Sequence, residues 1–227
     1  MSQESIKIFF FGDSICFGQG VSIHKGWVSK IAHKLDELSS NLNNRQFLLS
    51  NNSINGNTTR LALERMPYEV QSHRPEIVLT QFGMNDCNYW ETDNGCPRVS
   101  LDSFKANMME IVTRAFLNGS KIVIINTNHP TLKHNQMKNT SITYEDSNQF
   151  YNQAIRDVFK KIESTYLGKV FLNDVEAKFR EEIIHTPLSN LVLPDCLHLS
   201  ERGHAIYFDT VFPTILRSIE LLCRESK

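Results

Sequence analysis

A serine follows directly after the first apolar run of the chain. The run ends in Phe10 and Phe11 and leads into Gly12, Asp13 and Ser14. A serine at the turn between a strand and a helix can present its hydroxyl beside backbone N–H groups, which suits a nucleophile. The alternative is that Gly12 makes a turn while Asp13 or Ser14 caps the next helix. Taken alone, this segment indicates a nucleophile or a helix start.

An aspartate and a histidine lie three residues apart near the other end of the chain, at Asp195 and His198. On a tight turn the carboxylate can accept the Nδ1 proton of the imidazole, which leaves Nε2 free to act as a base. The pair could equally be a helix-start aspartate beside a partly exposed histidine. A metal site is not predicted, because Asp195, Cys196 and His198 have no matching ligand cluster elsewhere in the sequence.

Two further polar segments follow apolar runs. Gly56 lies in an Asn-rich and Thr-rich segment, where its backbone N–H could point into a crevice. Asn85 follows Gly83 closely, and its side-chain amide could donate to a developing oxyanion. Each segment on its own is also explained by turn formation, since Gly and Asn are favoured where φ is positive.

The elements that must position these residues alternate between short β-branched or aromatic runs and longer stretches of helical period. Strands are predicted at Lys7–Phe11, Phe47–Ser50, Glu76–Gln81, Lys121–Asn126 and Lys169–Leu172. Helices are predicted at Trp27–Leu38, Thr58–Ser72, Leu101–Leu117, Tyr144–Tyr166, Val175–Ile183 and Ser200–Leu222. Near-continuous apolar strands indicate a parallel sheet buried on both faces, so the pattern predicts an α/β protein with three α/β/α layers. The loops beyond the carboxyl ends of such strands form the ligand crevice.

Composition narrows the classes of protein further. The chain has 227 residues and a formal net charge of −1, which suits a single domain spanning 1–227 and argues against a nucleic-acid partner. No apolar run approaches the roughly 18 residues of a membrane helix, and the opening segment does not read as a signal peptide. The five cysteines are an odd number without CxxC spacing. We therefore expect reduced thiols and a cytoplasmic location, while the sequence gives no indication of the oligomeric state.

The four polar segments occur in an order that resembles the SGNH hydrolases, also called the GDSL esterase/lipase family. The resemblance is carried by Gly12-Asp13-Ser14-Ile15, the Gly56 segment with Thr58 and Thr59, Gly83-x-Asn85-Asp86 and Asp195-x-x-His198. Departures from the commonest pattern are Cys16, Met84 and Asn55, which leave the chemical groups intact.

The resemblance implies a flavodoxin-like fold with a five-stranded parallel sheet and no metal or organic cofactor. It implies that Ser14 is the nucleophile, His198 the base and Asp195 its support. It also implies an oxyanion hole formed by the backbone N–H groups of Ser14 and Gly56 and by the Asn85 side chain.

The substrate predicted on this basis is a small O-acyl ester. The stretch from Gly12 to Gly20 with Lys25-Gly26-Trp27 is similar to compact bacterial members of the family that deacylate O-acetylated sugars. Lysophospholipid or acyl-thioester hydrolysis and acyl transfer to a sugar hydroxyl would use the same residues. A non-catalytic flavodoxin-like module that binds a small ligand is a further alternative. The candidate substrate-binding residues are Asp13, Tyr89, Trp90 and His129.

Overall fold

A central sheet of five parallel strands organises the computed structural model, which describes residues 5–39 and 45–225. The strand order is β2-β1-β3-β4-β5, the arrangement of flavodoxin-like folds. All five predicted strands are present, within two residues of their predicted bounds. They are β1 (Ser5–Gly12), β2 (Gln46–Asn51), β3 (Ile77–Gln81), β4 (Ile122–Asn126) and β5 (Val170–Asn173).

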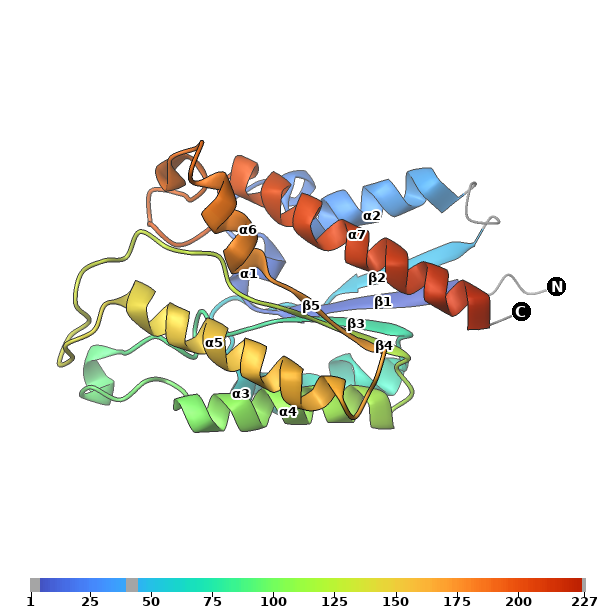
Figure 1. The fold of residues 1–227 in the computed structure, drawn as a ribbon, viewed down its shortest axis with the longest axis horizontal. Coiled ribbons are helices and arrows are strands. Elements are labelled where there is room, and N and C mark those ends of the chain that lie inside the picture. The colour runs from blue at the N-terminus through green and yellow to red at the C-terminus, as the bar shows by residue number, and fades with distance from the viewer. Residues whose placement is uncertain (1–4, 40–44, 226–227) are drawn as a thin grey trace.

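The helices lie on both faces of this sheet. Figure 1 shows α2, α6 and α7 on one face and α3, α4 and α5 on the other, which confirms the predicted three-layer α/β/α architecture. The helices are α1 (Ser14–Phe17), α2 (Trp27–Leu38), α3 (Thr59–Glu69), α4 (Leu101–Leu117), α5 (Tyr144–Glu163), α6 (Val175–Glu182) and α7 (Glu201–Glu225).

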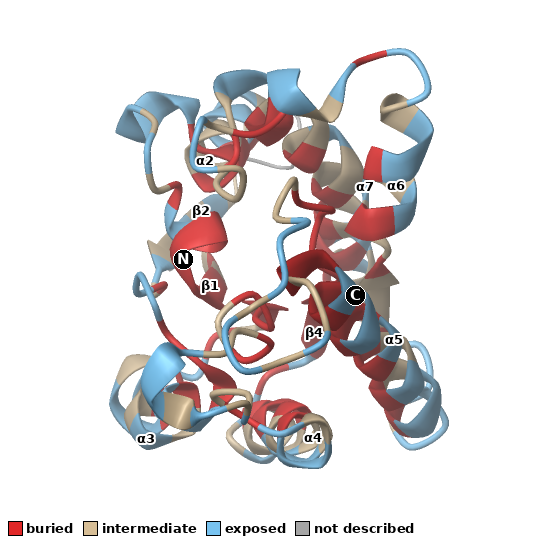
Figure 2. Ribbon diagram, turned by 90° about the vertical axis from the view of Figure 1, so that its left-hand side faces the viewer, coloured by how far each residue is buried: buried red, intermediate tan, exposed pale blue. Residues whose placement is uncertain are grey.

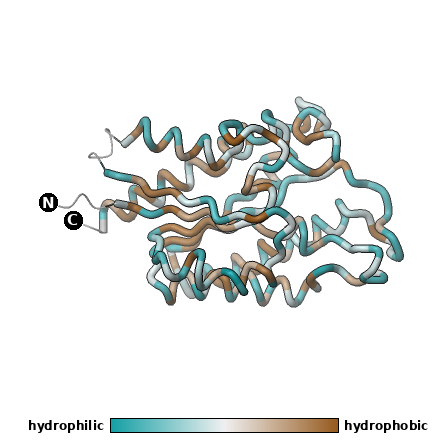
Figure 3. The backbone as a smooth tube through the Cα atoms, turned by 180° about the vertical axis from the view of Figure 1, so that it is seen from behind, coloured by the Kyte–Doolittle hydropathy of each residue, from teal (hydrophilic) through white to brown (hydrophobic). Residues whose placement is uncertain are grey.

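The apolar content of the inner strands explains this layering. Every residue of β3 and β4 is buried, because each side of the sheet is covered by helices. Figure 3 shows the same pattern along the backbone, with hydrophobic residues concentrated on the strands and hydrophilic residues on the outer turns. The edge strand β2 is more exposed and alternates between exposed and half-buried residues over its first four positions.

Side-chain caps fix where several helices begin. Thr58 accepts a hydrogen bond from the N–H of Leu61 at the start of α3, and Asp174 accepts from Ala177 at the start of α6. Thr143 and Asp146 form a reciprocal capping box at the start of α5. These local signals are the reason that helix starts are predicted well from sequence.

Two helices end three residues earlier than the sequence predicts. The helix predicted over Thr58–Ser72 stops at Glu69, and a 3₁₀ turn at Gln71–His73 follows. The helix predicted over Tyr144–Tyr166 stops at Glu163, and the chain then turns through Gly168, whose φ is +73°. In both cases apolar residues continue at helical spacing into a turn beyond the end of the helix. Hydrophobic periodicity alone therefore predicts a helix that is too long.

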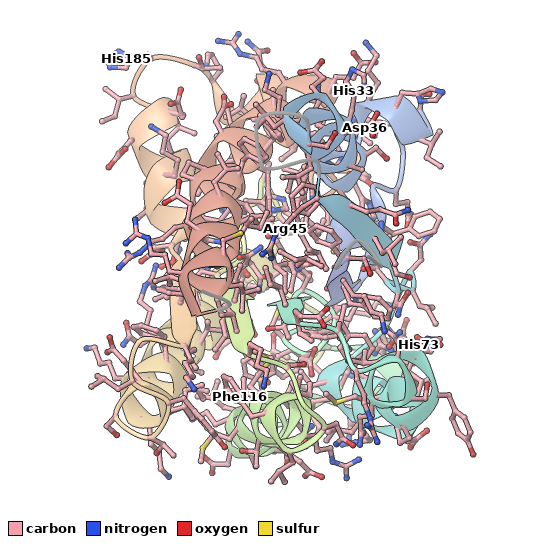
Figure 4. All side chains as sticks on the ribbon, turned by 90° about the vertical axis from the view of Figure 1, so that its right-hand side faces the viewer. His33, Asp36, Arg45, His73, Phe116 and His185 are labelled. Atoms are coloured by element: carbon pink, nitrogen blue, oxygen red, sulfur yellow. The ribbon has the colours of Figure 1, made fainter. Side chains whose placement is uncertain are left out.

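The carboxyl ends of the strands meet at one edge of the sheet, where the candidate chemical residues are found. Figure 2 looks onto this edge, with the helices around it and irregular segments between them. Figure 4 looks onto the opposite end of the sheet, where His33 is labelled in the upper layer of helices and His73 in the lower one.

No helix within residues 5–39 and 45–225 combines the length and the apolar content needed to cross a membrane. The five cysteines all lie in this part of the chain and are free thiols.

The packing of α7 against the loop that carries Asp195 and His198 gives a first prediction. A Cβ atom at Gly203 would overlap the carbonyl oxygen of Leu191 and lie 3.0 Å from Leu199 Cδ2. Although alanine has the higher helix propensity by about 1 kcal/mol, overpacking against backbone costs about 1–3 kcal/mol. We expect Gly203→Ala to lower the free energy of unfolding measured by urea titration. Glu220→Ala, at an exposed position of the same helix, is the control, with an expected change within about 0.5 kcal/mol. A stabilised Gly203→Ala protein would contradict the close packing.

Candidate active site

Ser14 is the first residue of α1, a four-residue helix that begins directly after β1. Asp13 caps this helix, because its Oδ1 accepts the N–H of Ile15 at 3.0 Å. The strand-to-helix turn is crowded: a Cβ at Gly12 would lie 2.6 Å from Cys16 Cβ and 2.7 Å from the Gln81 carbonyl oxygen. The absence of a side chain at Gly12 lets α1 pack tightly against β3. Asp13 is therefore the residue that caps the helix, and the Ser14 hydroxyl takes no part in the cap.

Ser14, His198 and Asp195 form a continuous hydrogen-bonded chain. Ser14 Oγ lies 2.9 Å from His198 Nε2, and His198 Nδ1 lies 2.6 Å from Asp195 Oδ2. A carboxylate can only accept, so Nδ1 carries the proton and Nε2 is left to accept the Ser14 hydroxyl hydrogen. The structure thus joins two segments that lie 184 residues apart.

The Asp195–His198 turn is held by the Asp195 side chain together with backbone hydrogen bonds. Asp195 Oδ1 accepts the N–H groups of Leu197 and His198 at 3.0 and 2.9 Å, while the His198 carbonyl accepts the N–H of Leu193. Cys196 adopts a φ of +65°, which the tight turn requires. Partial burial acts to raise the pKa of Asp195, but the hydrogen bonds from the His198 side chain and the two N–H groups outweigh it and lower the pKa. Asp195 is therefore ionised and able to orient the imidazole.

His129 lies behind this turn rather than on the rim. Its side chain is fully buried, and Nε2 lies 2.8 Å from the carbonyl oxygen of Leu197, between Asp195 and His198. Burial lowers the pKa of His129 to about 4, so the ring is neutral and its Nε2–H donates to Leu197. The sequence interpretation of His129 as a substrate contact is therefore wrong, because a residue with no exposed surface supports the turn instead.

Asn85 is connected to the nucleophile segment through Asp13. Asn85 Nδ2 donates to Asp13 Oδ2 at 3.3 Å, and Asn85 Oδ1 accepts from Arg98 Nη1 at 3.3 Å. The neighbouring Asp86 is buried and accepts both the N–H and the hydroxyl of Thr59, at 2.9 and 2.5 Å. These contacts fix the orientation of the Asn85 amide and leave its second N–H for another acceptor.

Asp13 itself is completely buried, so the expectation that it contacts substrate is also wrong. Its carboxyl group accepts hydrogen bonds from the N–H of Ile15 and from the side-chain amide of Asn85.

The segment that contains Gly56 is tied to the same turn. Ile54 donates its N–H to the Gly12 carbonyl at 3.1 Å, and Gly56 follows with a φ of +75°. Arg65 strengthens this connection, since Nη2 donates to the Gly12 carbonyl and Nε donates to Asn57 Oδ1. The segments that contain Gly56 and Asn85 are therefore hydrogen-bonded to the two residues before Ser14, the first to Gly12 and the second to Asp13.

Three N–H groups near this turn suit an anionic oxygen. The backbone N–H groups of Ser14 and Gly56 have no hydrogen-bond acceptor within residues 5–39 and 45–225. The Asn85 amide uses one N–H on Asp13.

Tyr89 and Trp90 lie on the segment after Asn85, as the sequence indicates. Tyr89 is half-buried, whereas Trp90 is 50% exposed and packs against the Arg98 guanidinium, 4.1 Å from the ring centroid. Trp90 is therefore the better placed of the two to touch a ligand.

The segments are held together by residues that the sequence does not mark as functional, notably Arg65, Arg98 and Gln81. Gln81 Oε1 accepts the N–H of Cys16 at 3.1 Å, which anchors α1 to β3. A polar residue at the end of an otherwise apolar strand is a usable signal for Gln81. No comparable signal marks Arg65 or Arg98, because their roles depend on partners that only folding brings close.

Metal-ligand clusters are not a feature of the described chain: residues 5–39 and 45–225 contain no group of three or more His, Cys, Asp or Glu side chains placed to hold an ion.

Comparison with known proteins identifies the family. The family model described as "GDSL-like Lipase/Acylhydrolase family" matches residues 10–206. The chain is 35% identical over 85 residues to an arylesterase of Vibrio mimicus, covering 37% of this chain and 40% of that protein. It is 24% identical over 119 residues to esterase TesA of Pseudomonas aeruginosa, covering 52% of this chain and 53% of that one. The chain thus spans about half or less of the length of these relatives.

A solved structure supports the same assignment at the level of fold. The acetylxylan esterase Axe2 of Geobacillus stearothermophilus superposes with a TM-score of 0.71 over 96% of both chains, at 21% identity. Together with the family match, this shows that the chain belongs to the GDSL-like lipase/acylhydrolase family.

The buried carboxyl group of Asp13 gives a pH-dependent prediction. Burial raises the pKa of Asp13 to about 7, against the opposing effect of the Ile15 N–H, and the nearby Asp86 carboxylate adds to the rise. Between pH 4 and 7 the folded protein thus keeps a proton that the unfolded chain has released. This proton stabilises the fold at pH 5, and its contribution is lost as the pH rises through 7. We expect the stability of wild type relative to Asp13→Asn to fall from pH 5 to pH 8.

Urea unfolding at four pH values measures this difference. His129 and His204, whose pKa values burial lowers to about 4 and 3, are present in both proteins and largely cancel. Asp102→Asn, at an exposed position of α4, tests whether removing any carboxylate has the same effect. A difference that does not change with pH would show that Asp13 is not the titrating group.

Proposed function

We propose that the protein is a serine esterase that cleaves small O-acyl esters, with Ser14 as nucleophile, His198 as general base and Asp195 as its support. The observation that carries this proposal is the chain of hydrogen bonds from Ser14 Oγ to His198 Nε2 and from His198 Nδ1 to Asp195. Membership of a family described as lipases and acylhydrolases supports the same chemistry.

In the first half of the reaction, the Ser14 Oγ attacks the ester carbonyl carbon while His198 Nε2 takes the hydroxyl proton. The resulting imidazolium is stabilised by the ionised Asp195 on its other side. When the tetrahedral intermediate collapses, the bond to the alcohol oxygen breaks and the leaving group takes the proton from Nε2. The products of this half are the free alcohol and an acyl ester on Ser14.

In the second half, water replaces the alcohol. His198 Nε2 takes a proton from the water as its oxygen attacks the acyl carbon, and the proton then returns to Ser14 Oγ as the acid leaves. No electron transfer occurs and every proton is returned, so the reaction requires no co-reactant other than water.

The negative charge on the carbonyl oxygen is held in both halves by the N–H groups of Ser14, Gly56 and Asn85. Because Asp13 and Arg98 fix the Asn85 amide before substrate arrives, this donor needs no reorganisation during the reaction.

An acetyl ester of a carbohydrate is the substrate class we favour. The acetylxylan esterase Axe2 shares the fold, and the half-exposed Trp90 offers an aromatic surface of the kind that packs against sugar rings.

Hydrolysis of p-nitrophenyl acetate, butyrate and octanoate by wild type and Ser14→Ala tests the reaction and its acyl preference together. Removing the nucleophile is expected to lower kcat by several orders of magnitude on every ester that is turned over. The highest wild-type activity is expected on acetate. Activity that survives Ser14→Ala would refute the nucleophile, and a preference for octanoate would indicate lipid or thioester substrates instead.

Removal of the Asn85 amide tests the oxyanion donor. Asn85→Ala is expected to lower kcat about 100-fold to 1000-fold, because a preorganised donor is lost at the atom where charge develops. Circular dichroism and a thermal melt establish that the variant is folded. Asn88→Ala, three residues further along the chain, is the matched control. A loss of less than about tenfold for Asn85→Ala would remove Asn85 from the oxyanion hole.

A further inference from the structure

A pocket of about 430 Å³ lies beside the proposed oxyanion donor. Its lining includes Thr58, Arg60, Trp90, Asp93 and Arg98. Thr58 follows Gly56 by two residues, and Arg98 is hydrogen-bonded to the Asn85 amide oxygen at 3.3 Å. The pocket is therefore bordered by the same two segments that supply N–H groups to the reaction.

The charges around this pocket do not balance. It contains two arginines and a single carboxylate, that of Asp93. Within residues 5–39 and 45–225, neither Arg60 nor Arg98 forms a direct ion pair, although the Asp86 and Asp93 carboxylates attract Arg98 from a longer distance. The pocket lining therefore carries more positive than negative charge beside the segments of Gly56 and Asn85.

Arg98 is held in a fixed orientation despite lacking an ionic partner. The guanidinium lies over the Trp90 ring at 4.1 Å and makes one side-chain hydrogen bond, to Asn85. Its side chain is half-buried, so it loses part of its hydration without gaining a direct hydrogen bond to a carboxylate. A guanidinium has five N–H donors and binds carboxylates through two of them, so most of its capacity stays available to a ligand.

We infer that this pocket binds a negatively charged group of the substrate, such as a carboxylate, next to the ester that Ser14 attacks. The inference rests on the proposed esterase function and narrows its substrate class to esters of acidic molecules, for example an O-acylated sugar that carries a carboxylate. Arg98, held over the Trp90 ring, binds the anion through its free N–H groups, and the exposed Arg60 adds a second positive charge to the pocket lining.

Matched pairs of charged and neutral esters test the inference. One pair is 4-acetoxybenzoate and its methyl ester, which places the charge on the alcohol side. The other is the 4-nitrophenyl monoester of glutaric acid and 4-nitrophenyl butyrate, which places it on the acyl side. The quantity measured is the ratio of kcat/KM for the charged ester to that for its neutral partner. Intrinsic reactivity is the same for every variant, so a change in this ratio reports recognition of the charge.

Arg60 is the residue to alter, because Arg98 contacts Asn85 and its replacement would disturb the oxyanion donor. Arg60→Glu reverses the charge at an exposed position in the first turn of α3, where an acidic residue is favourable for the helix. We expect it to lower the ratio by at least about threefold for one of the pairs, with a smaller decrease for Arg60→Gln. The decrease should weaken as salt is added. Arg224→Gln, in the last turn of α7, is the matched control and should leave the ratio as in wild type.

A binding measurement separates this inference from the proposed function. The chain has two tryptophans, of which Trp27 is buried and Trp90 is half-exposed. Titration of Ser14→Ala protein with 4-methoxybenzoate, followed by tryptophan fluorescence, is expected to give saturable quenching. Arg60→Glu in the same protein should weaken it at least about threefold, and methyl 4-methoxybenzoate should bind more weakly.

Equal ratios for wild type, Arg60→Glu and Arg224→Gln, or equal binding of the charged and neutral ligands, would overturn the inference. Failure of the esterase proposal has a different signature, which is hydrolysis that does not depend on Ser14. Carboxylate binding that depends on Arg60 would then still support the anionic pocket.

Discussion

The close contact of Gly12 with β3 and α1 is the constraint on which the rest of the site depends. Its backbone has neighbours on every side: Gln81 and Cys16 fill the space of a side chain, while its carbonyl accepts from Ile54 and from Arg65. Any larger residue would push α1 away from the sheet and break the connection to the Gly56 segment at the same point. The positions of Ser14 and of the Gly56 segment therefore both depend on the packing and hydrogen bonds of Gly12 at the end of β1.

Polar residues beneath the site provide orientation at the expense of stability. Asp13, completely buried, raises the free energy of the folded state whenever it is ionised, yet it is the group that holds the Asn85 amide. His129 is similar, since a neutral imidazole with an unpaired Nδ1 is kept in the interior to hold the Leu197 carbonyl. Such unfavourable burial is common at functional sites, where precise placement matters more than the stability of the individual group.

The fold could be predicted from sequence because its signals are local. The bounds of α2 and α4 match the predicted ones at both ends, whereas four-residue α1 is too short to produce a period. The pairing of Asp195 with His198 was visible for the same reason, as three residues of spacing suffice to bring them together. Arg98 and Arg65 could not be assigned, because key partners lie far beyond a helical turn: Asn85 is 13 residues from Arg98, and Gly12 is 53 residues from Arg65. His129 was assigned wrongly because its place at a strand end says nothing about whether its side chain points into the interior.

The course of α7 has a practical consequence. This helix starts three residues after His198 and runs for 25 residues, roughly 37 Å, to the opposite edge of the sheet, where β1 also begins at Ser5. Figure 1 shows that the start of β1 and the end of α7 lie together at the end of the sheet opposite α1, the helix that Ser14 begins. A solid support, a fluorescent reporter or a second enzyme attached beyond either end would face away from incoming substrate, so the molecule is suited to being tethered while its reactive edge stays open to solution.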